Sequence, residues 1–104
     1  MAKLYYKEVI VSAYFKEMGL PPCVYEYRHI PNRKFRLDIA WPELRIGIEV
    51  QGGLHMKSGH STASGLRKDM EKRNLGLIEG WRVLECEPAN LCMKETVDMV
   101  KAIL

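Results

Sequence analysis

Two acidic residues, Asp38 and Glu49, lie within apolar segments where burial of a carboxylate is unfavourable. Asp38 lies within residues 35–40 and Glu49 within residues 45–51, and in both segments apolar and polar residues alternate as in half-buried strands. Residues 42–43 favour a turn, so the two segments predict an antiparallel hairpin. A buried carboxylate costs several kcal/mol unless it is paired or binds a cation. Two such groups at facing strand ends therefore suggest a metal site.

Glu49 and Gln51 are two residues apart, so on a strand their side chains project from the same face. The backbone carbonyl of the intervening residue lies between them. Mg²⁺ prefers carboxylate and carbonyl oxygens and leaves room for water and phosphate, so the pattern suits this ion. A structural alternative stays open, in which Asp38 pairs with Arg36 or Arg45 and Glu49 faces solvent.

The N-terminal half is expected to contain one helix before the hairpin. Residues 3–18 are rich in helix formers, and Gly19 followed by two prolines predicts where this helix ends. Residues 23–29 favour a strand but are short. Residues 52–65 are too polar and glycine-rich for a regular element and long enough to be a functional loop. The apolar stripe of the first helix is expected to be Tyr6, Ile10, Ala13 and Tyr14.

The C-terminal half predicts a helix, a strand and a last helix. Residues 66–79 are densely charged but amphipathic, and Gly80 ends that helix. Residues 81–86 predict a third core strand in which Trp81 is a core residue, and Asn90 is suited to cap the last helix. The expected buried stripes are Leu66, Met70 and Leu77 in the first of these helices and Val97, Val100 and Leu104 in the second.

The composition is that of one modest domain. The chain has 104 residues, 47% of them hydrophobic, which predicts a single domain over residues 1–104. We expect an α/β fold with a mixed central sheet flanked by helices. No run approaches the roughly 20 apolar residues of a membrane span, so a cytoplasmic protein without a membrane partner is expected. Cys23, Cys86 and Cys92 are odd in number and lack metal-ligand spacing, which favours buried free thiols.

Basic residues bracket the acidic pair in sequence. The net charge of +3 permits a nucleic-acid partner without requiring one. Lysine and arginine contacts to phosphates give affinity without sequence specificity. For residues 66–79 a solvated, salt-bridged helix is an equal alternative, since Asp69 and Arg73 are spaced i,i+4. The clusters are Arg28, His29, Arg33, Lys34 and Arg36 before Asp38, and Lys57, Arg67, Lys68, Lys72 and Arg73 after Gln51.

Five short runs together carry a family resemblance over roughly residues 27–86. They are FRLDIAWP at residues 35–42, IEVQGG at residues 48–53, Gly59-His60, DMEKRN at residues 69–74 and GWRVL at residues 80–84. In this combination the chain resembles the PD-(D/E)xK nuclease superfamily, and within it the small phage and bacterial nucleases related to very-short-patch repair endonucleases. The resemblance implies a restriction-endonuclease-like fold.

The resemblance also implies an activity, Mg²⁺-dependent endonucleolytic hydrolysis of DNA in the cytoplasm of a bacterium or a phage-infected host. In that reading Asp38, Glu49 and the Val50 carbonyl hold Mg²⁺, with Mn²⁺ as a substitute, and a metal-bound water attacks the phosphorus. Expected DNA contacts are Arg33, Lys34, Arg36, Lys57, Arg67, Lys72 and Arg73.

Gln51 departs from the family pattern, which has lysine at that position. A glutamine orients water by hydrogen bonding but does not stabilise charge as an ammonium does. A lysine from the following helix can take that role, and the candidates are Lys68 and Lys72. We assign Gln51 and Lys68 to the catalytic set.

Histidines and one further acid complete the expected site. The related repair endonucleases use loop histidines near the reacting phosphate, which implies the same role for His55 and His60. Exposed loop histidines are the alternative, and a zinc site of these histidines with cysteines is disfavoured by their spacing. Glu8 is a candidate metal ligand because the first helix of the superfamily often supplies a glutamate, and Glu17 competes with it.

Two other functions share the same residues. A nuclease that resolves branched DNA such as Holliday junctions would act as a homodimer, because two cuts must be placed symmetrically. A catalytically inactive DNA-binding domain of the same fold is suggested by Gln51 in place of lysine.

Overall fold

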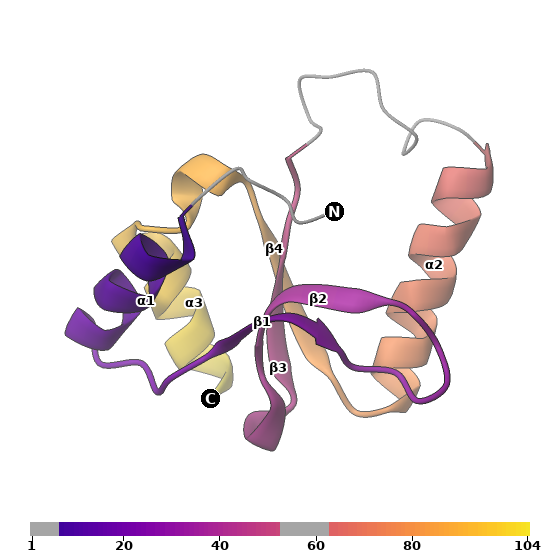
Figure 1. Ribbon diagram of the computed structural model, residues 1–104, viewed down its shortest axis with the longest axis horizontal. Coiled ribbons are helices and arrows are strands. Elements are labelled where there is room, and N and C mark those ends of the chain that lie inside the picture. Colours follow the sequence, from indigo (N-terminus) through magenta and orange to yellow (C-terminus); the bar gives the residue numbers. More distant parts are fainter. Residues whose placement is uncertain (1–6, 53–62) are drawn as a thin grey trace.

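Four strands form one mixed sheet at the centre of the molecule (Figure 1). The computed structural model describes residues 7–52 and 63–104. The strand order is β1-β2-β3-β4, and β1/β2 and β2/β3 are antiparallel whereas β3/β4 is parallel. The strands are β1 (Val24–Arg28), β2 (Arg36–Trp41), β3 (Ile46–Val50) and β4 (Arg82–Cys86).

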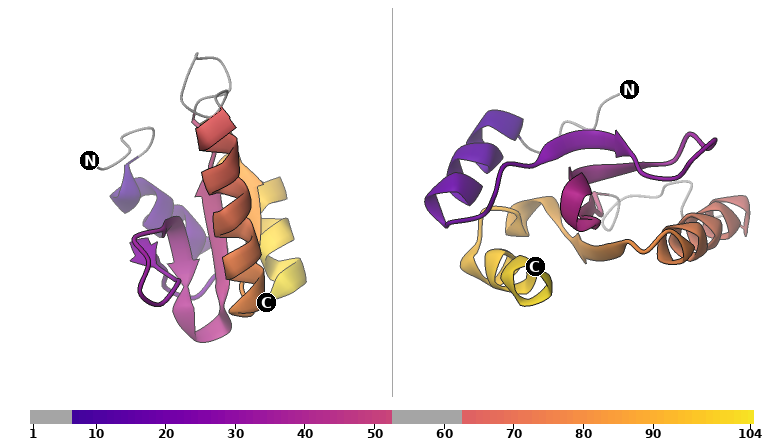
Figure 2. Two further views of the ribbon diagram at one scale, coloured as in Figure 1. Left: turned by 90° about the vertical axis from the view of Figure 1, so that its right-hand side faces the viewer. Right: turned by 90° about the horizontal axis from the view of Figure 1, so that it is seen from below.

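The three α-helices of the described residues lie on both sides of this sheet (Figure 2). Helices α1 (Glu8–Glu17) and α3 (Lys94–Ile103) lie on one side, and α2 (Ala63–Ile78) lies on the other. Helix α2 connects the parallel strands β3 and β4, as parallel pairing requires a crossover. The predicted α/β class, with a mixed sheet flanked by helices, is confirmed.

The main apolar core lies between the sheet and helices α1 and α3. Phe15, Ile39, Ile48 and Val97 are examples of its fully buried side chains. A smaller cluster on the α2 side contains Leu37, Ala40 and Trp81, so the prediction that Trp81 is a core residue is confirmed. Most of the apolar burial therefore takes place on the side away from α2.

The predicted hairpin of β2 and β3 is confirmed. Its turn is a short 3-10 helix, η1 (Pro42–Leu44), followed by Arg45 in the left-handed conformation with φ 53°. The paired residues run from Trp41 opposite Ile46 to Ile39 opposite Ile48. With the same register, Asp38 comes next on β2 and Glu49 next on β3.

Helix α1 ends as predicted but buries a different stripe. Gly19, at φ 87°, follows the end of the helix. Val11 and Phe15 are its buried residues, whereas the expected Ile10 is 58% exposed and Ala13 is also exposed. The i,i+4 spacing was recognised but assigned one residue too early. Tyr14 is half-buried, and Tyr6 lies outside the described residues.

Helix α2 contradicts the predicted apolar stripe. Leu66, Met70 and Leu77 are 51%, 53% and 74% exposed. Along the helix only Gly76 is buried, and it lies against the imidazole of His29. The stripe was wrong because α2 approaches the sheet through a glycine and charged side chains rather than through its apolar residues.

The last helix differs from the prediction at both ends. Asn90 belongs to a separate 3-10 helix, η3 (Pro88–Asn90), and the N-cap of α3 is Met93 without a side-chain hydrogen bond. The Thr96 hydroxyl instead donates to the Asn90 carbonyl at 2.6 Å. Val97 and Val100 are buried as expected, but Leu104 follows the last helical residue and is 49% exposed.

The three cysteines are free thiols, as expected, but are less buried than predicted. Cys23 and Cys86 are half-buried and Cys92 is exposed. None of the helices in residues 7–52 and 63–104 is long and apolar enough to cross a membrane.

Gly47 in β3 and Gly76 in α2 predict opposite results for the same substitution. A Cβ at Gly47 would lie 2.5 Å from Leu37 Cδ1 and 3.1 Å from the Ile39 carbonyl oxygen. We expect Gly47→Ala to lower the free energy of unfolding by about 1–3 kcal/mol through overpacking. A Cβ at Gly76 would lie 3.6 Å from His29 Nε2, which is an ordinary van der Waals contact. Gly76→Ala should therefore raise the free energy of unfolding by up to about 1 kcal/mol, because alanine has a higher helix propensity than glycine. Urea unfolding measures both, and a stable Gly47→Ala variant would contradict the packing of β3.

Candidate functional site

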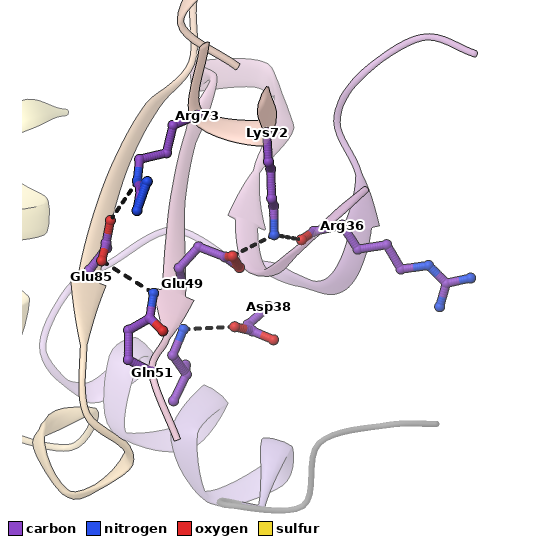
Figure 3. Close-up of polar contacts among 8 residues, drawn as sticks. Arg36, Asp38, Glu49, Gln51, Lys72, Arg73 and Glu85 are labelled. Carbon is purple, nitrogen blue, oxygen red and sulfur yellow. Dashed lines mark hydrogen bonds and ion pairs between the residues drawn. The ribbon is translucent and has the colours of Figure 1, made fainter. Parts of the chain in front are cut away.

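Asp38 lies where the ladder between β2 and β3 ends. Its side chain is buried, and Oδ2 accepts a hydrogen bond from the Val50 backbone N–H at 2.7 Å (Figure 3). A buried backbone N–H needs an acceptor, and here a carboxylate takes the place of a carbonyl from the neighbouring strand. The Asp38 carboxylate is thereby fixed beside the backbone of Val50, the residue expected to contribute a carbonyl ligand.

Glu49 is held by a lysine from α2. The Lys72 ammonium forms an ion pair with Glu49 Oε2, and these side chains are 19% and 16% exposed. The same ammonium donates to the backbone carbonyl of Arg36 in β2. The alternative in which Glu49 faces solvent is therefore wrong. Lys72 links β2, β3 and α2 at one point, as Figure 3 shows.

A third acid, Glu85, lies beside this pair and was missed in the sequence. Glu49 and Glu85 are partners in the parallel register of β3 and β4. The Gln51 amide donates to Glu85 Oε1 at 3.2 Å, and Arg73 Nε lies 3.7 Å from Glu85 Oε2. Asp38, Glu49 and Glu85 thus occupy three successive strands. The alternation of residues 81–86 already placed Glu85 on a strand. Only the parallel register of β3 and β4, however, shows that Glu85 lies beside Glu49.

A pocket of about 290 Å³ opens between α2 and the sheet at Glu49 and Glu85, whereas the buried Asp38 is not among its lining residues. Its polar lining includes Glu49, Gln51, Lys72, Arg73 and Glu85, and we call it the site pocket. Apolar groups line its other walls, so charges there are partly shielded from water. The apolar lining residues are Leu37, Leu77, Trp81 and Val83.

His29 also lines the site pocket, and it is neutral near pH 7. The imidazole is 6% exposed and packs edge-on against Trp81, with ring centroids 5.5 Å apart. Burial lowers its pKa from 6.5 to about 4, and the nearby Lys72 ammonium acts in the same direction. The expectation that His29 adds to the positive cluster is therefore wrong.

The oxygen ligands at Asp38, Glu49 and Val50 are of the types that a hard divalent cation prefers, but Lys72 already contacts one of them. Within the part of the chain that is described, no group of three or more histidine, cysteine, aspartate or glutamate side chains could hold a metal. The carboxylates of Asp38 and Glu49 and the Val50 carbonyl are nevertheless oxygen ligands of the kind that Mg²⁺ takes while retaining water. Since Lys72 is paired with Glu49 Oε2, a cation that binds this oxygen competes with the ammonium.

The structure does not bring the remaining candidate site residues into contact with Asp38 or Glu49 within the described part of the chain. Glu8 is exposed in the first turn of α1, and Glu17 is exposed in its last turn. Helix α1 begins near the end of the molecule toward which β3 runs (Figure 1). Both glutamates stay predictions as metal ligands. Lys68 is exposed on α2, so Lys72 rather than Lys68 is the lysine that reaches Glu49. His55, His60 and Lys57 lie outside the described residues.

The expected DNA contacts fall into two groups. Arg33 and Arg73 are engaged, since Arg33 pairs with Glu71 at 2.7 Å and Arg73 pairs with Glu85 on the sheet. The side chains of Lys34, Arg36 and Arg67 are exposed, as a phosphate contact requires.

The comparisons with known proteins add no relative. No family model matches the chain, and no similar curated protein or solved structure was found. The interpretation of the site therefore depends on its geometry and chemistry.

The neutral state of His29 predicts how stability depends on pH. Between pH 6.5 and about 4 the unfolded chain binds a proton at His29 that the folded chain does not bind. The free energy of unfolding should therefore decrease as the pH falls through this range. Urea unfolding at several pH values should show a shallower decrease for His29→Gln than for the natural chain. Equal pH dependence of the two chains would contradict a buried neutral imidazole.

Proposed function

We propose that this chain is an endonuclease that hydrolyses phosphodiester bonds in DNA with Mg²⁺. The observation that carries the proposal is the pair Asp38 and Glu49 at the end of the β2–β3 ladder, where the backbone N–H of Val50 in β3 donates to the Asp38 carboxylate in β2. Neither carboxylate is on a freely solvated surface, and each is of the chemical type that a hard cation prefers.

The architecture supports the same proposal. The order α-β-β-β-α-β, with an antiparallel hairpin followed by a parallel crossover, is the arrangement expected of a restriction-endonuclease-like fold. Helix α2 presents Lys72 to Glu49 of β3 and to the backbone of β2. In the proposed hydrolase the acidic residues would be the metal ligands and Lys72 the neighbouring positive group.

The roles of the residues follow from their contacts. When bound, Mg²⁺ supplies charge stabilisation at the phosphate and makes water a better nucleophile. Asp38 and Glu49, with the Val50 carbonyl, would hold it. Lys72, which contacts Glu49, would take the role that the family pattern gives to a lysine at position 51. Once Glu49 has a cation partner, the Lys72 ammonium can donate to a phosphate oxygen, and Gln51 stays fixed by Glu85.

A DNA-binding domain of the same fold without activity is the second candidate. The observation that favours it is the Lys72–Glu49 ion pair, which already neutralises one of the two proposed metal ligands. In such a domain the pair would be structural and would replace the cation.

Cleavage assays with the natural chain and with variants that lack either carboxylate distinguish an endonuclease from an inactive DNA-binding domain. We expect the natural chain to cleave plasmid DNA with Mg²⁺ or Mn²⁺, and Asp38→Asn or Glu49→Gln to lower the rate about 10³-fold, because several kcal/mol of charge stabilisation is lost. Binding of DNA in EDTA should persist in both variants. Glu43→Gln, at an exposed acid of η1, is the matched control and should cleave normally. No cleavage of linear, nicked or branched DNA with either ion would refute the nuclease.

The two lysines of α2 provide a test of the lysine role. Lys72→Gln should lower the cleavage rate about 100-fold, the cost of removing one preorganised donor near developing charge. Lys68→Gln removes the same charge from an exposed position and should change the rate little. Single-turnover cleavage rates at saturating DNA measure both. Equal loss in the two variants would show that Lys72 acts only through general attraction of DNA.

A further inference from the structure

A second and larger depression, of about 700 Å³, lies next to the site pocket. It is formed by the end of β1 and residues 29–34, by the β2–β3 turn and by the chain that joins α2 to β4. We call it the basic groove, because its lining includes Arg28, Arg33, Lys34 and Arg45 but only one acid, Glu79.

Two of these four cations are already engaged in holding the walls. Arg33 pairs with Glu71 of α2 and lies over the Phe35 ring at 4.9 Å. Arg45 donates to the backbone carbonyl of Glu79, just beyond the end of α2. Arg28 and Lys34 are exposed, and neither side chain has a hydrogen bond or an ion pair with another described residue. The groove therefore has fixed walls and two cations available to a ligand.

The basic groove adjoins the site pocket. His29 and Trp81 line both depressions, so the same two buried rings form the wall between them. Neither ring carries a charge that would repel a phosphate. The cations Arg28 and Lys34 therefore lie in a depression next to the one that contains Glu49 and Lys72.

We propose that the basic groove binds the sugar-phosphate backbone of the DNA strand that flanks the phosphodiester at the candidate site. The assignment of the strand as a substrate rests on the proposed function. Phosphates are the repeated anions of such a ligand, and cation contacts to them position the strand without reading its sequence. Arg28 and Lys34 are the phosphate contacts, and Arg33 and Arg45 keep the groove open.

The test is DNA binding by the full chain in EDTA, where no cleavage takes place. Labelled duplex DNA and single-stranded DNA are titrated by fluorescence anisotropy between about 50 and 200 mM KCl. The groove variant is Arg28→Gln with Lys34→Gln. The matched control is Lys16→Gln with Arg82→Gln, which removes the same charge. Lys16 is exposed on α1, and Arg82 alternates with Val83 and so points away from the site pocket.

The expected result is a difference in salt dependence. Each lost phosphate contact should lower the slope of log affinity against log salt by about 0.9 on duplex DNA, and by about 0.7 on a single strand. The groove variant should therefore lose about two such increments and at least about tenfold in affinity at low salt, whereas the control keeps the natural slope. Equal slopes for the groove variant and the control would overturn the proposal.

One additional variant keeps this result separate from the proposed function. Asp38→Asn with the natural groove should bind DNA with the same salt dependence as the natural chain, whether or not the natural chain cleaves DNA. Groove-dependent binding without any cleavage would refute the nuclease and support the groove. Cleavage with unaltered binding in the groove variant would support the nuclease and overturn the groove.

Discussion

The position of α2 depends on the ammonium of Lys72. Among the residues of α2 only Gly76 is fully buried, and four of its large apolar residues, Leu66, Met70, Leu77 and Ile78, are exposed, so apolar packing does little to hold it. Lys72 joins the helix to Glu49 in β3 and to the carbonyl of Arg36 in β2. Arg73 adds a contact to Glu85 in β4. The polar groups that hold the helix on the sheet are therefore the same groups that make up the candidate site.

This sharing couples the chemistry of the site to its structure. Glu49 is only partly exposed, and a carboxylate there needs a positive partner. Lys72 supplies that partner in the structure described, and a divalent cation would supply it in the proposed enzyme. In the proposed enzyme, the exchange would release an ammonium beside the phosphate, so that Lys72 would supply the positive charge that Gln51 lacks. Gln51 then serves mainly to fix Glu85.

The sequence allowed the hairpin, the two acidic positions and the mixed sheet to be predicted, because strand alternation and turn residues are local signals. Asp38 and Glu49 could be placed on neighbouring strands for that reason. The sequence did not show that Leu66, Met70 and Leu77 are exposed. Helical spacing identifies an apolar stripe but does not show whether that stripe packs against another element or faces solvent. Glu85 was missed, and of the two candidate lysines Lys68 rather than Lys72 was assigned to the catalytic set, since both results depend on how β4 and α2 return to β3, which is a property of tertiary structure.

The proposal centres on a cation held by Asp38 and Glu49, and a crystal of the natural chain soaked in Mn²⁺ tests it most directly. The anomalous scattering of manganese locates the ion independently of any activity. The account predicts an anomalous peak between the two carboxylates and the Val50 carbonyl, with the Lys72 ammonium displaced from Glu49. Absence of a peak at these oxygens, with Lys72 still paired to Glu49, would contradict it.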